Sequence, residues 1–336
     1  MDVLYQSTRS KEVGVLIPCH NPGQVLTQAI EHLDENISQN YELVLVLDNC
    51  TKNEIQTITD YLELFKEKSS KLAKLSVVTT FVNFYETRSD NKGFKILGET
   101  KYVIELQADI LIKEKNFDVK YLRAFEKVPD LLAISGRGIQ GFVTDYKPSF
   151  LNFLREILHL IRKNSLLDDR KNDDSLDRSP RPPSIRSQVV LRERDFYEEN
   201  FFGLFGENIE SRVRNYDEVC LNLYLGHSIF RGPIFFDSRK LRELEFLNEK
   251  SHRLGNDDHE ICSRAWAQMG WRVGYIPLDI ESRLSWGATR KKKNASELFS
   301  FMLMKFVVFN MKRESFLYSF GRDKFDGYPK EIIRNI

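Results

Sequence analysis

The stretch VGVLIPCHN, residues 13–21, decides the fold class of this chain. Its first five residues form a continuous apolar run that is typical of a buried strand, and Pro18 is expected to end that strand. Residues 24–37 then carry apolar side chains three and four positions apart, which predicts an amphipathic helix. A buried strand followed at once by such a helix is the repeating unit of a parallel α/β sheet.

The same alternation continues through the first half of the chain. Apolar runs predict strands, and periodic segments between them predict helices, the last of which Asn91 would cap. Near-continuous apolar strands separated by helices indicate a mostly parallel, Rossmann-like sheet covered on both faces. The expected strands are residues 42–47, 75–81, 102–106 and 131–135, and the expected helices are residues 53–69 and 91–100; later come regular structure over 227–236, helices over 238–250 and 257–270, a strand at 271–276 and a helical tail after residue 295.

The composition is that of an ordinary globular chain and argues against several function classes. The 336 residues are 41% hydrophobic, and 50 basic against 49 acidic residues leave a formal charge of +1. The broad basic footprint of a nucleic-acid binder is therefore missing. Four widely spaced cysteines show no zinc-ligand spacing, which favours reduced thiols in a cytoplasmic compartment. The sequence shows no secretory signal segment, and no apolar run is long enough to span a bilayer.

Polar residues follow the expected strands at the edge where parallel sheets bind ligands. After the first strand, His20 presents a flat ring that could stack on a nucleobase, although Pro18 and Asn21 are also ordinary turn formers. After the second strand, Asp48 could accept a hydrogen bond from a base or a ribose, or it could cap the following helix. Asp109 follows the fourth strand and would lie beside Asp48, where a carboxylate suits a hard divalent cation or simply closes a turn.

Two adjacent carboxylates, Asp257 and Asp258, begin a late helix. The helix dipole alone explains acidic residues at that position, because it favours negative charge in the first turn. The functional alternative makes one of the pair a general base that removes a proton from a hydroxyl group.

Taken in this order, the segments resemble the family-2 glycosyltransferases of GT-A fold. That family has a strand running into Pro-x-Tyr/His-Asn, an Asp after the second strand, an Asn-x-Gly segment, an Asp-x-Asp type motif and an acidic segment ending in Arg-Ala. The resemblance covers roughly residues 13–135 and 227–289. The matching segments are VGVLIPCHN, Asp48, Asn91-Lys92-Gly93, LQAD ending at Asp109, DDHEICSRA starting at Asp257, and the Gly-Pro turn Arg231-Gly232-Pro233.

The resemblance implies an inverting transfer of a sugar from a nucleotide diphosphate to a hydroxyl acceptor. It implies that Asp258 is the general base, supported by Asp257. It also implies that Asp109 holds a divalent cation, Mn²⁺ or Mg²⁺, which bridges the two phosphates. The donor would contact Pro18, His20, Asn21, Asp48, Asn91, Lys92, Gly93, Gln107 and Ala108, and the acceptor would contact Gly232, Pro233 and His259.

The sequence departs from the family pattern in two places. Gln107 stands where the family has the first Asp of its Asp-x-Asp motif, and the family's C-terminal histidine has no clear counterpart near residues 283–287. The main alternative is therefore a GT-A domain that binds a nucleotide sugar or a partner without turnover. A sugar-nucleotide pyrophosphorylase is a weaker alternative, because it would need a glycine-rich loop after the first strand, where only Gly23 lies.

The chain is interpreted as a single GT-A catalytic domain. Residues 12–140 would form the nucleotide-sugar-binding half and residues 226–290 the half that carries the acceptor site and the base. Between them lies a variable insertion, residues 141–225, whose polar stretch 163–186 is either a solvated loop or a lid. The aromatic residues of the helical tail, 291–336, favour core packing or a homo-oligomer contact. The expected acceptor is a glycan, a glycoconjugate or a protein hydroxyl.

Overall fold

The computed structural model of the chain describes residues 2–9, 11–97, 100–140, 220–226, 228–229, 231–250, 257–282, 295–311 and 331–336, with parts of 150–162. The expected loop or lid at 163–186 and most of the 141–225 insertion lie outside the described residues, as does the segment that would hold the family's C-terminal histidine.

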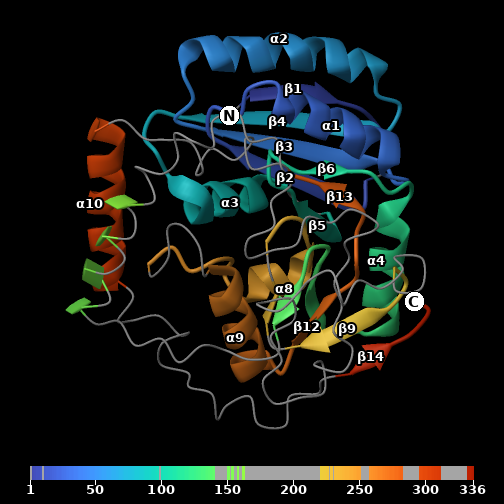
Figure 1. The fold of residues 1–336 in the computed structure, drawn as a ribbon. Helices are drawn as coiled ribbons and strands as arrows, with labels where there is room; N and C mark the ends of the chain where they lie inside the picture. Colours follow the sequence, from blue (N-terminus) through green and yellow to red (C-terminus); the bar gives the residue numbers. More distant parts are fainter. Residues whose placement is uncertain are drawn as a thin grey trace.

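Ten described strands form one central sheet in the order β1-β4-β3-β2-β5-β11-β7-β12-β9-β14 (Figure 1). Strands β2, β3, β4, β5, β7, β12 and β14 run in one direction and β1, β11 and β9 in the other, so the mostly parallel sheet is confirmed. The short pairs β8 with β10 and β6 with β13 lie outside this sheet. The strands are β1 (Asp2–Gln6), β2 (Val13–Cys19), β3 (Tyr41–Asp48), β4 (Leu72–Thr80), β5 (Tyr102–Glu105), β6 (Leu111–Ile112), β7 (Leu131–Ser135), β8 (Ile139–Gln140), β9 (Leu223–Gly226), β10 (Ser228–Ile229), β11 (Ile234–Asp237), β12 (Arg272–Tyr275), β13 (Ile280–Glu281) and β14 (Ile332–Ile333).

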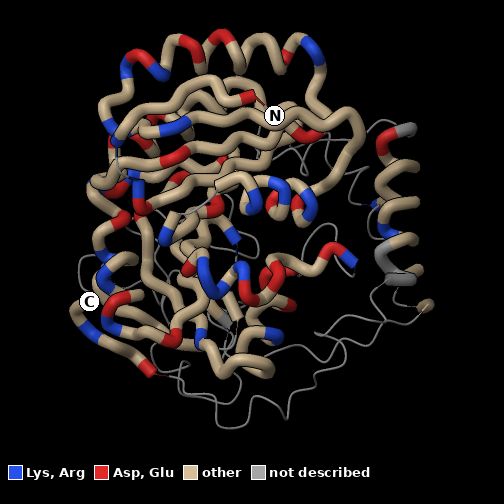
Figure 2. The backbone as a smooth tube through the Cα atoms, turned by 180° about the vertical axis from the view of Figure 1, so that it is seen from behind, with Lys and Arg blue, Asp and Glu red and all other residues tan. Residues whose placement is uncertain are grey.

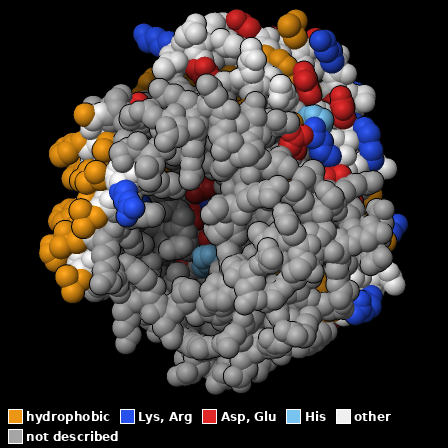
Figure 3. All heavy atoms as spheres, in the orientation of Figure 1, with side chains coloured by type: hydrophobic (Ala, Val, Ile, Leu, Met, Phe, Trp, Pro, Cys, Tyr) orange, Lys and Arg blue, Asp and Glu red, His pale blue; other side chains and the backbone are white. Residues whose placement is uncertain are grey.

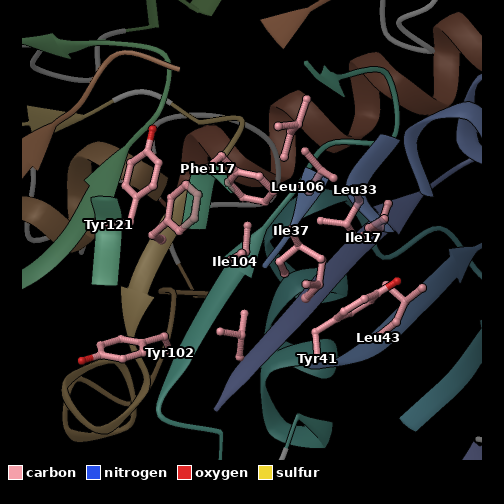
Figure 4. Packing of buried hydrophobic residues seen from close by; sticks show 14 of the residues in the cluster. Ile17, Leu33, Ile37, Tyr41, Leu43, Tyr102, Ile104, Leu106, Phe117 and Tyr121 are labelled. Carbon is pink, nitrogen blue, oxygen red and sulfur yellow. The ribbon is translucent and has the colours of Figure 1, made fainter. Parts of the chain in front are cut away.

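Helices cover both faces of the sheet, as the continuous apolar strands predict. Successive residues of β3 point to opposite faces: Leu43 packs with the helices of one face and Val44 with those of the other. Figure 4 shows part of the hydrophobic core on the face of the sheet to which Leu43 points, where Leu33 and Ile37 lie beside Ile17 of β2. One face carries α1 (Val25–Asn36), α2 (Lys52–Lys68) and α4 (Phe117–Lys127), the other carries α3 (Tyr85–Ile96), α8 (Ser238–Glu243) and α9 (Asp257–Met269), and α10 (Ala295–Met311) stands to one side (Figure 1).

The sheet brings the ends of several strands to one edge. β2, β3, β4, β5 and β7 all finish there, because they run in the same direction. β11 runs the opposite way between β5 and β7, and it pairs Ile234 with Glu105 and with Ser135. The residues that precede β11 therefore enter at the same edge, which is where open α/β sheets bind ligands.

Pro18 does not end the first predicted strand, because β2 continues to Cys19. The pairing of β2 with β5 stops at Leu16, whereas its pairing with β3 continues to Cys19. Beyond Leu16 the edge of β2 that faces β5 has no strand partner, so the missing N–H of proline costs no ladder hydrogen bond there.

The third helix begins earlier than the sequence predicts. α3 starts at Tyr85, and Asn91 lies inside it instead of capping it. The predicted helix over 238–250 is also wrong in length, because α8 ends at Glu243. Glu245 and Phe246 have positive φ angles of 56° and 67°, a left-handed conformation that a helix cannot contain.

Charged and apolar side chains are distributed differently over the described surface. Lys, Arg, Asp and Glu are interspersed along the backbone (Figure 2). Exposed apolar side chains instead gather along one side, over α10 and the described parts of 150–162 (Figure 3). These two segments touch through the rings of Phe153 and Phe306, whose centroids lie 5.7 Å apart. None of the described helices is long and apolar enough to cross a membrane.

Candidate functional site

The loops after β2 and β3 hold each other in place at the carboxyl edge of the sheet. The Nδ1–H of His20 donates to the main-chain carbonyl of Asp48 at 2.7 Å, which fixes the imidazole ring. The Oδ1 of Asn21 accepts from the N–H of Thr51 at 3.0 Å, and the N–H of Asn21 lies 3.3 Å from the sulfur of Cys50. The half-buried His20 ring is thus oriented by the protein before any ligand arrives.

Asp48 is buried, and its carboxylate begins α3. Its Oδ1 accepts from the hydroxyl of Thr80 at 2.7 Å and from the N–H of Phe84 at 2.8 Å, and its Oδ2 accepts from the N–H of Tyr85 at 2.9 Å. The cap of the following helix α2 is Thr51 instead. Asp48 therefore does cap a helix, but one that lies more than thirty residues further along the chain.

The predicted donor residues of α3 have packing roles. The side-chain amide of Asn91 donates to the carbonyl of Leu247 at 2.8 Å and to Glu249 at 2.9 Å, and its oxygen accepts from the N–H of Leu247 at 2.9 Å. A Cβ atom on Gly93 would lie 2.1 Å from Leu16 on β2, so only glycine lets the helix approach this closely. Asn91 and Gly93 therefore have packing roles in the fold, and their predicted ribose and diphosphate contacts stay predictions. The ammonium group of Lys92 lies 5.2 Å from the ring centroid of Phe84.

The turn after β5 lies against the Gly-Pro turn before β11. Residues 107–110 close a turn through a 3.2 Å hydrogen bond from the N–H of Ile110 to the carbonyl of Gln107, and Ala108 and Asp109 form its half-buried tip. A Cβ on Gly232 would lie 2.6 Å from the side-chain oxygen of Gln107. Gly232 also has a φ of +74°, and its bond to Pro233 is cis. The positive φ angle favours glycine at 232, because other residues rarely adopt this backbone conformation.

Gln107 itself explains the departure from the Asp-x-Asp pattern. Its amide nitrogen donates to a carboxylate oxygen of Glu86 at 3.1 Å. An aspartate at position 107 would instead place a second negative charge beside Glu86, which is unfavourable in a partly buried position.

Asp257 and Asp258 lie at the start of α9, both buried. Asp258 accepts from the N–H of Arg231 at 3.3 Å and from the N–H of His259 at 2.9 Å. Asp257 accepts from the hydroxyl of Thr87 at 2.8 Å and from the guanidinium of Arg231 at 2.5 Å. Arg231 thus holds the two acids in different ways: its guanidinium pairs with Asp257, whereas its main-chain N–H donates to Asp258.

A buried cluster of charges, which the sequence did not reveal, surrounds these acids. Its centre is the guanidinium of Arg231, and its acids come from α3, β5 and α9. Glu105 was the one detectable signal, because a carboxylate interrupts the apolar run of β5. Together with Asp48, which caps α3, the cluster links β3, α3, β5, α9 and the loop before β11. We call these residues the Arg231 cluster: Arg231, Glu86, Asp90, Glu105 and Asp257.

Burial dominates the electrostatics of the cluster. Glu105 is 1% exposed, and this burial raises its pKa to about 7; Arg231 opposes the shift, and Glu86, Asp257 and Asp258 add to it. Burial also raises the pKa of Asp90 well above its usual range. Some of the carboxyl groups in the cluster are therefore protonated near neutral pH.

Replacing Glu105 by Gln is expected to flatten the pH dependence of stability. A carboxyl whose folded pKa is raised stabilises the fold fully below its unfolded pKa of about 4.3, and that stability is lost as the pH rises through about 7. The loss from this one group is on the order of 3 kcal/mol at most. Urea unfolding at pH 5 and pH 8 should therefore show a smaller decline for Glu105→Gln than for the wild type.

A matched control is available in β3. Glu42 is also buried, but it lies 2.5 Å from Lys11 and 2.6 Å from Lys74, so Glu42→Gln should destabilise the protein by removing the partner of two cations. Parallel pH curves for the wild type and Glu105→Gln would show that Glu105 carries no such shift.

Acidic and histidine side chains are visible near the centre of the face shown in Figure 3. His259 is half-buried at the start of α9, and its Nδ1 contacts the hydroxyl of Ser228 on β10. The predicted residues after β5, before β11 and at the start of α9 are thus brought together, and His20 and Asn21 join them along the same sheet edge through Asp48 and α3.

The described residues do not form a metal site built from several protein side chains. Among them, no three His, Cys, Asp or Glu side chains are grouped as a metal site. Asp109, the predicted cation ligand, lies on the turn after β5; one protein carboxylate is the usual share of a Mg²⁺-type site whose remaining ligands are substrate phosphates and water.

Comparisons with known proteins bear on the fold. No family model and no curated protein matches the chain. GalNAc-T7, crystallised with UDP, GalNAc and Mn²⁺, aligns with 83% of this chain at 13% identity and a TM-score of 0.51; the alignment covers 46% of GalNAc-T7, so this chain spans less than half of its length. The mannosyltransferase PcManGT from Pyrobaculum calidifontis, in complex with GDP-Man and Mn²⁺, aligns over 94% of this chain and 72% of its own at 12% identity, with a TM-score of 0.48. S. aureus TarS 1–349 in complex with UDP-GlcNAc aligns over 88% and 66% at 12% identity, with a TM-score of 0.43.

At identities this low, similarity is one of architecture. The alignment with GalNAc-T7 agrees with the observed order of helices on both faces of a mostly parallel sheet, and with the resemblance stated from the sequence. The chain therefore has the GT-A glycosyltransferase fold.

Proposed function

We propose that this chain is an inverting glycosyltransferase that moves a sugar from a nucleotide-diphosphate donor to a hydroxyl acceptor. One observation carries the proposal: the turn that bears Asp109, the Gly232-Pro233 turn and the start of α9 with Asp258 lie together at the ligand edge of a GT-A sheet. These are the parts that hold the diphosphate, the acceptor and the base in the proposed reaction.

The proposed chemistry is a single in-line displacement at the anomeric carbon. Asp258 removes the proton of the acceptor hydroxyl as its oxygen attacks, and the transition state has oxocarbenium character. The main-chain N–H groups of Arg231 and His259 donate to the carboxylate and aim it. Gly232 and Pro233 would position the acceptor, with His259 beside the base.

The proposed donor site begins at the ends of β2 and β3. The ring of His20, already oriented by Asp48, would stack on the base, with Pro18 and Asn21 shaping the turn around it. The Oδ2 of Asp48 accepts one described hydrogen bond, from Tyr85, and so keeps acceptor capacity for a base or ribose. Further along the edge, Gln107, Ala108 and Lys92 would flank the diphosphate.

Asp109 would hold a divalent cation, Mn²⁺ or Mg²⁺, in the proposed donor complex. Such an ion stabilises the negative charge that develops on the departing nucleotide diphosphate. The UDP and Mn²⁺ in the GalNAc-T7 structure make a nucleotide-diphosphate sugar with Mn²⁺ a reasonable choice of donor and cation to test here.

We propose a glycan, a glycoconjugate or a protein hydroxyl as the acceptor.

A second copy of the chain is the proposed partner for the apolar surface over α10, since exposed apolar patches of this kind mark interaction sites. Light scattering would show a dimer mass if this is so. Four free cysteines agree with a reducing, cytoplasmic setting, which stays a prediction.

The direct test is a panel of nucleotide sugars with the purified protein. A thermal-shift screen, with and without Mn²⁺, identifies the donor, because a ligand that binds only the folded state raises its melting temperature. Donor hydrolysis, measured by release of nucleotide diphosphate, then tests turnover. Binding without any turnover would favour the alternative of a catalytically degenerate GT-A domain. No binding by any nucleotide sugar would contradict both.

A further inference from the structure

Arg231 lies at the centre of the cluster and bridges three elements of the fold. Its guanidinium approaches Glu86 at 2.9 Å and Asp90 at 2.6 Å on α3, Glu105 at 3.9 Å on β5, and Asp257 at 2.5 Å on α9. Only 3% of Arg231 is exposed. A guanidinium suits this position, because its planar fork of donors reaches several carboxylates at once.

The same residue also holds the proposed base through its main chain. The N–H of Arg231 donates to Oδ2 of Asp258 at 3.3 Å. The side chain holds Asp257 and the main chain holds Asp258, so Arg231 contacts both acids at the start of α9. The hydroxyl of Thr87 adds a second contact to Asp257, which ties the start of α9 to α3.

The charges in the cluster require this cation. Burial alone would lower the pKa of Arg231, but Asp257, Asp90 and Glu86 raise it well above its usual value, so it stays charged. Without it, the same buried carboxylates would face one another uncompensated, and α3, β5 and α9 would be pushed apart.

We infer that Arg231 is a positioning residue for Asp258: it fixes the start of α9 against the sheet edge and aims the base at the acceptor hydroxyl. This inference rests on the proposed function. Arg231 is buried, so it acts on the reaction through Asp258 and α9. The sequence gives no sign of this role, because the residue precedes a Gly-Pro turn that was assigned to the acceptor.

The test compares two substitutions with a matched control. Arg231→Lys keeps the charge, but a single ammonium group cannot bridge α3 and α9 as the guanidinium does. Arg231→Met combined with Asp90→Asn removes the cation together with the carboxyl group nearest to it on α3, so one buried acid fewer is left to compensate. Arg272→Lys is the control, because Arg272 lies on β12 and pairs with Asp130 and Glu331 instead of the two acids.

Arg231→Lys is expected to lower kcat roughly tenfold to a hundredfold, because a misaimed reacting group costs rate even when binding persists. The dissociation constant of the nucleotide-diphosphate product, measured by calorimetry, should stay within about threefold of wild type, so the loss appears in kcat and not in KM for the donor. The acidic limb of the kcat profile should move to higher pH in the double variant, because the base has lost its nearby cation. Arg272→Lys should change neither readout.

A folded Arg231→Lys with wild-type kcat and an unshifted pH profile overturns the inference. If Arg231→Lys does not fold, the double variant provides the same readouts, and unchanged kcat there overturns it equally. A wild-type chain without turnover is a different outcome, since it ends the proposed function. In that case ¹³C NMR titration of Asp258, assigned by the Asp258→Asn spectrum, decides: its pKa should rise in the double variant, and an unchanged pKa overturns the inference alone.

Discussion

Asp258→Asn is expected to lower turnover by about 10²–10⁴-fold, the range that general-base assistance typically contributes. An amide cannot accept the acceptor's proton, and its single oxygen can keep one of the two hydrogen bonds that the N–H groups of Arg231 and His259 donate to separate oxygens of the carboxylate. Losing one hydrogen bond costs about 1–3 kcal/mol, so the fold and the donor site should survive. Release of nucleotide diphosphate measures turnover, and calorimetry with the nucleotide diphosphate should give a nearly unchanged dissociation constant.

Asp237→Asn is the matched control for this prediction. Asp237 also lies at a helix N-terminus, where it accepts from the N–H groups of Arg239 and Lys240 at the start of α8. It is at the opposite end of β11 from the Gly-Pro turn, so its substitution should leave turnover unchanged. Equal turnover in the wild type and in Asp258→Asn would remove Asp258 from the role of base.

Asp109→Ala is expected to abolish the part of donor binding that depends on the metal. In the proposed site this carboxylate is the protein's ligand to the cation, and the diphosphate and water supply the others. Titration of a nucleotide diphosphate into the wild type should give a larger heat with Mn²⁺ than without it. In Asp109→Ala the two titrations should coincide, while metal-independent binding at the base and ribose remains.

Asp60→Ala serves as the control for this second prediction, because Asp60 is exposed on α2 and contacts Gln56 on the same helix. It should keep the heat increment with Mn²⁺. If the Asp109→Ala protein also keeps the heat increment, residues other than Asp109 bind the cation.

The sheet was predictable because each strand carries its own signal. The continuous apolar runs of β2, β3 and β5 and the periodic helices between them are local patterns, and the structure confirms them. Local patterns also misled: the Asn-Lys-Gly segment at residues 91–93 has the composition of a helix start, yet α3 already begins at Tyr85. The residue that starts it is Asp48, whose carboxylate reaches the N–H groups of Phe84 and Tyr85 from another strand.

The Arg231 cluster shows what spacing rules cannot reveal. Asp258 could be identified from its acidic neighbour and its helix start, both of which are adjacent in sequence. The members of the cluster come from α3, β5, α9 and the loop before β11, so no short segment contains the pattern. Only the folded arrangement shows that Arg231 neutralises Asp257, and therefore that the two neighbouring acids have different surroundings.

The tight contact between Gly93 and Leu16 couples the packing of α3 on the sheet to the geometry of the candidate site. A methyl group at position 93 would wedge against β2, with its carbon 2.1 Å from a Leu16 methyl in the present geometry, and the helix would tilt away from the sheet. The first turns of that helix carry Glu86 and Asp90, which hold Arg231. A single added carbon at Gly93, which has no polar side chain, would thus disturb the contacts that hold Arg231 and, through it, Asp258, from about one helical turn or more away. We expect a search for inactive variants to find this substitution among the most damaging ones.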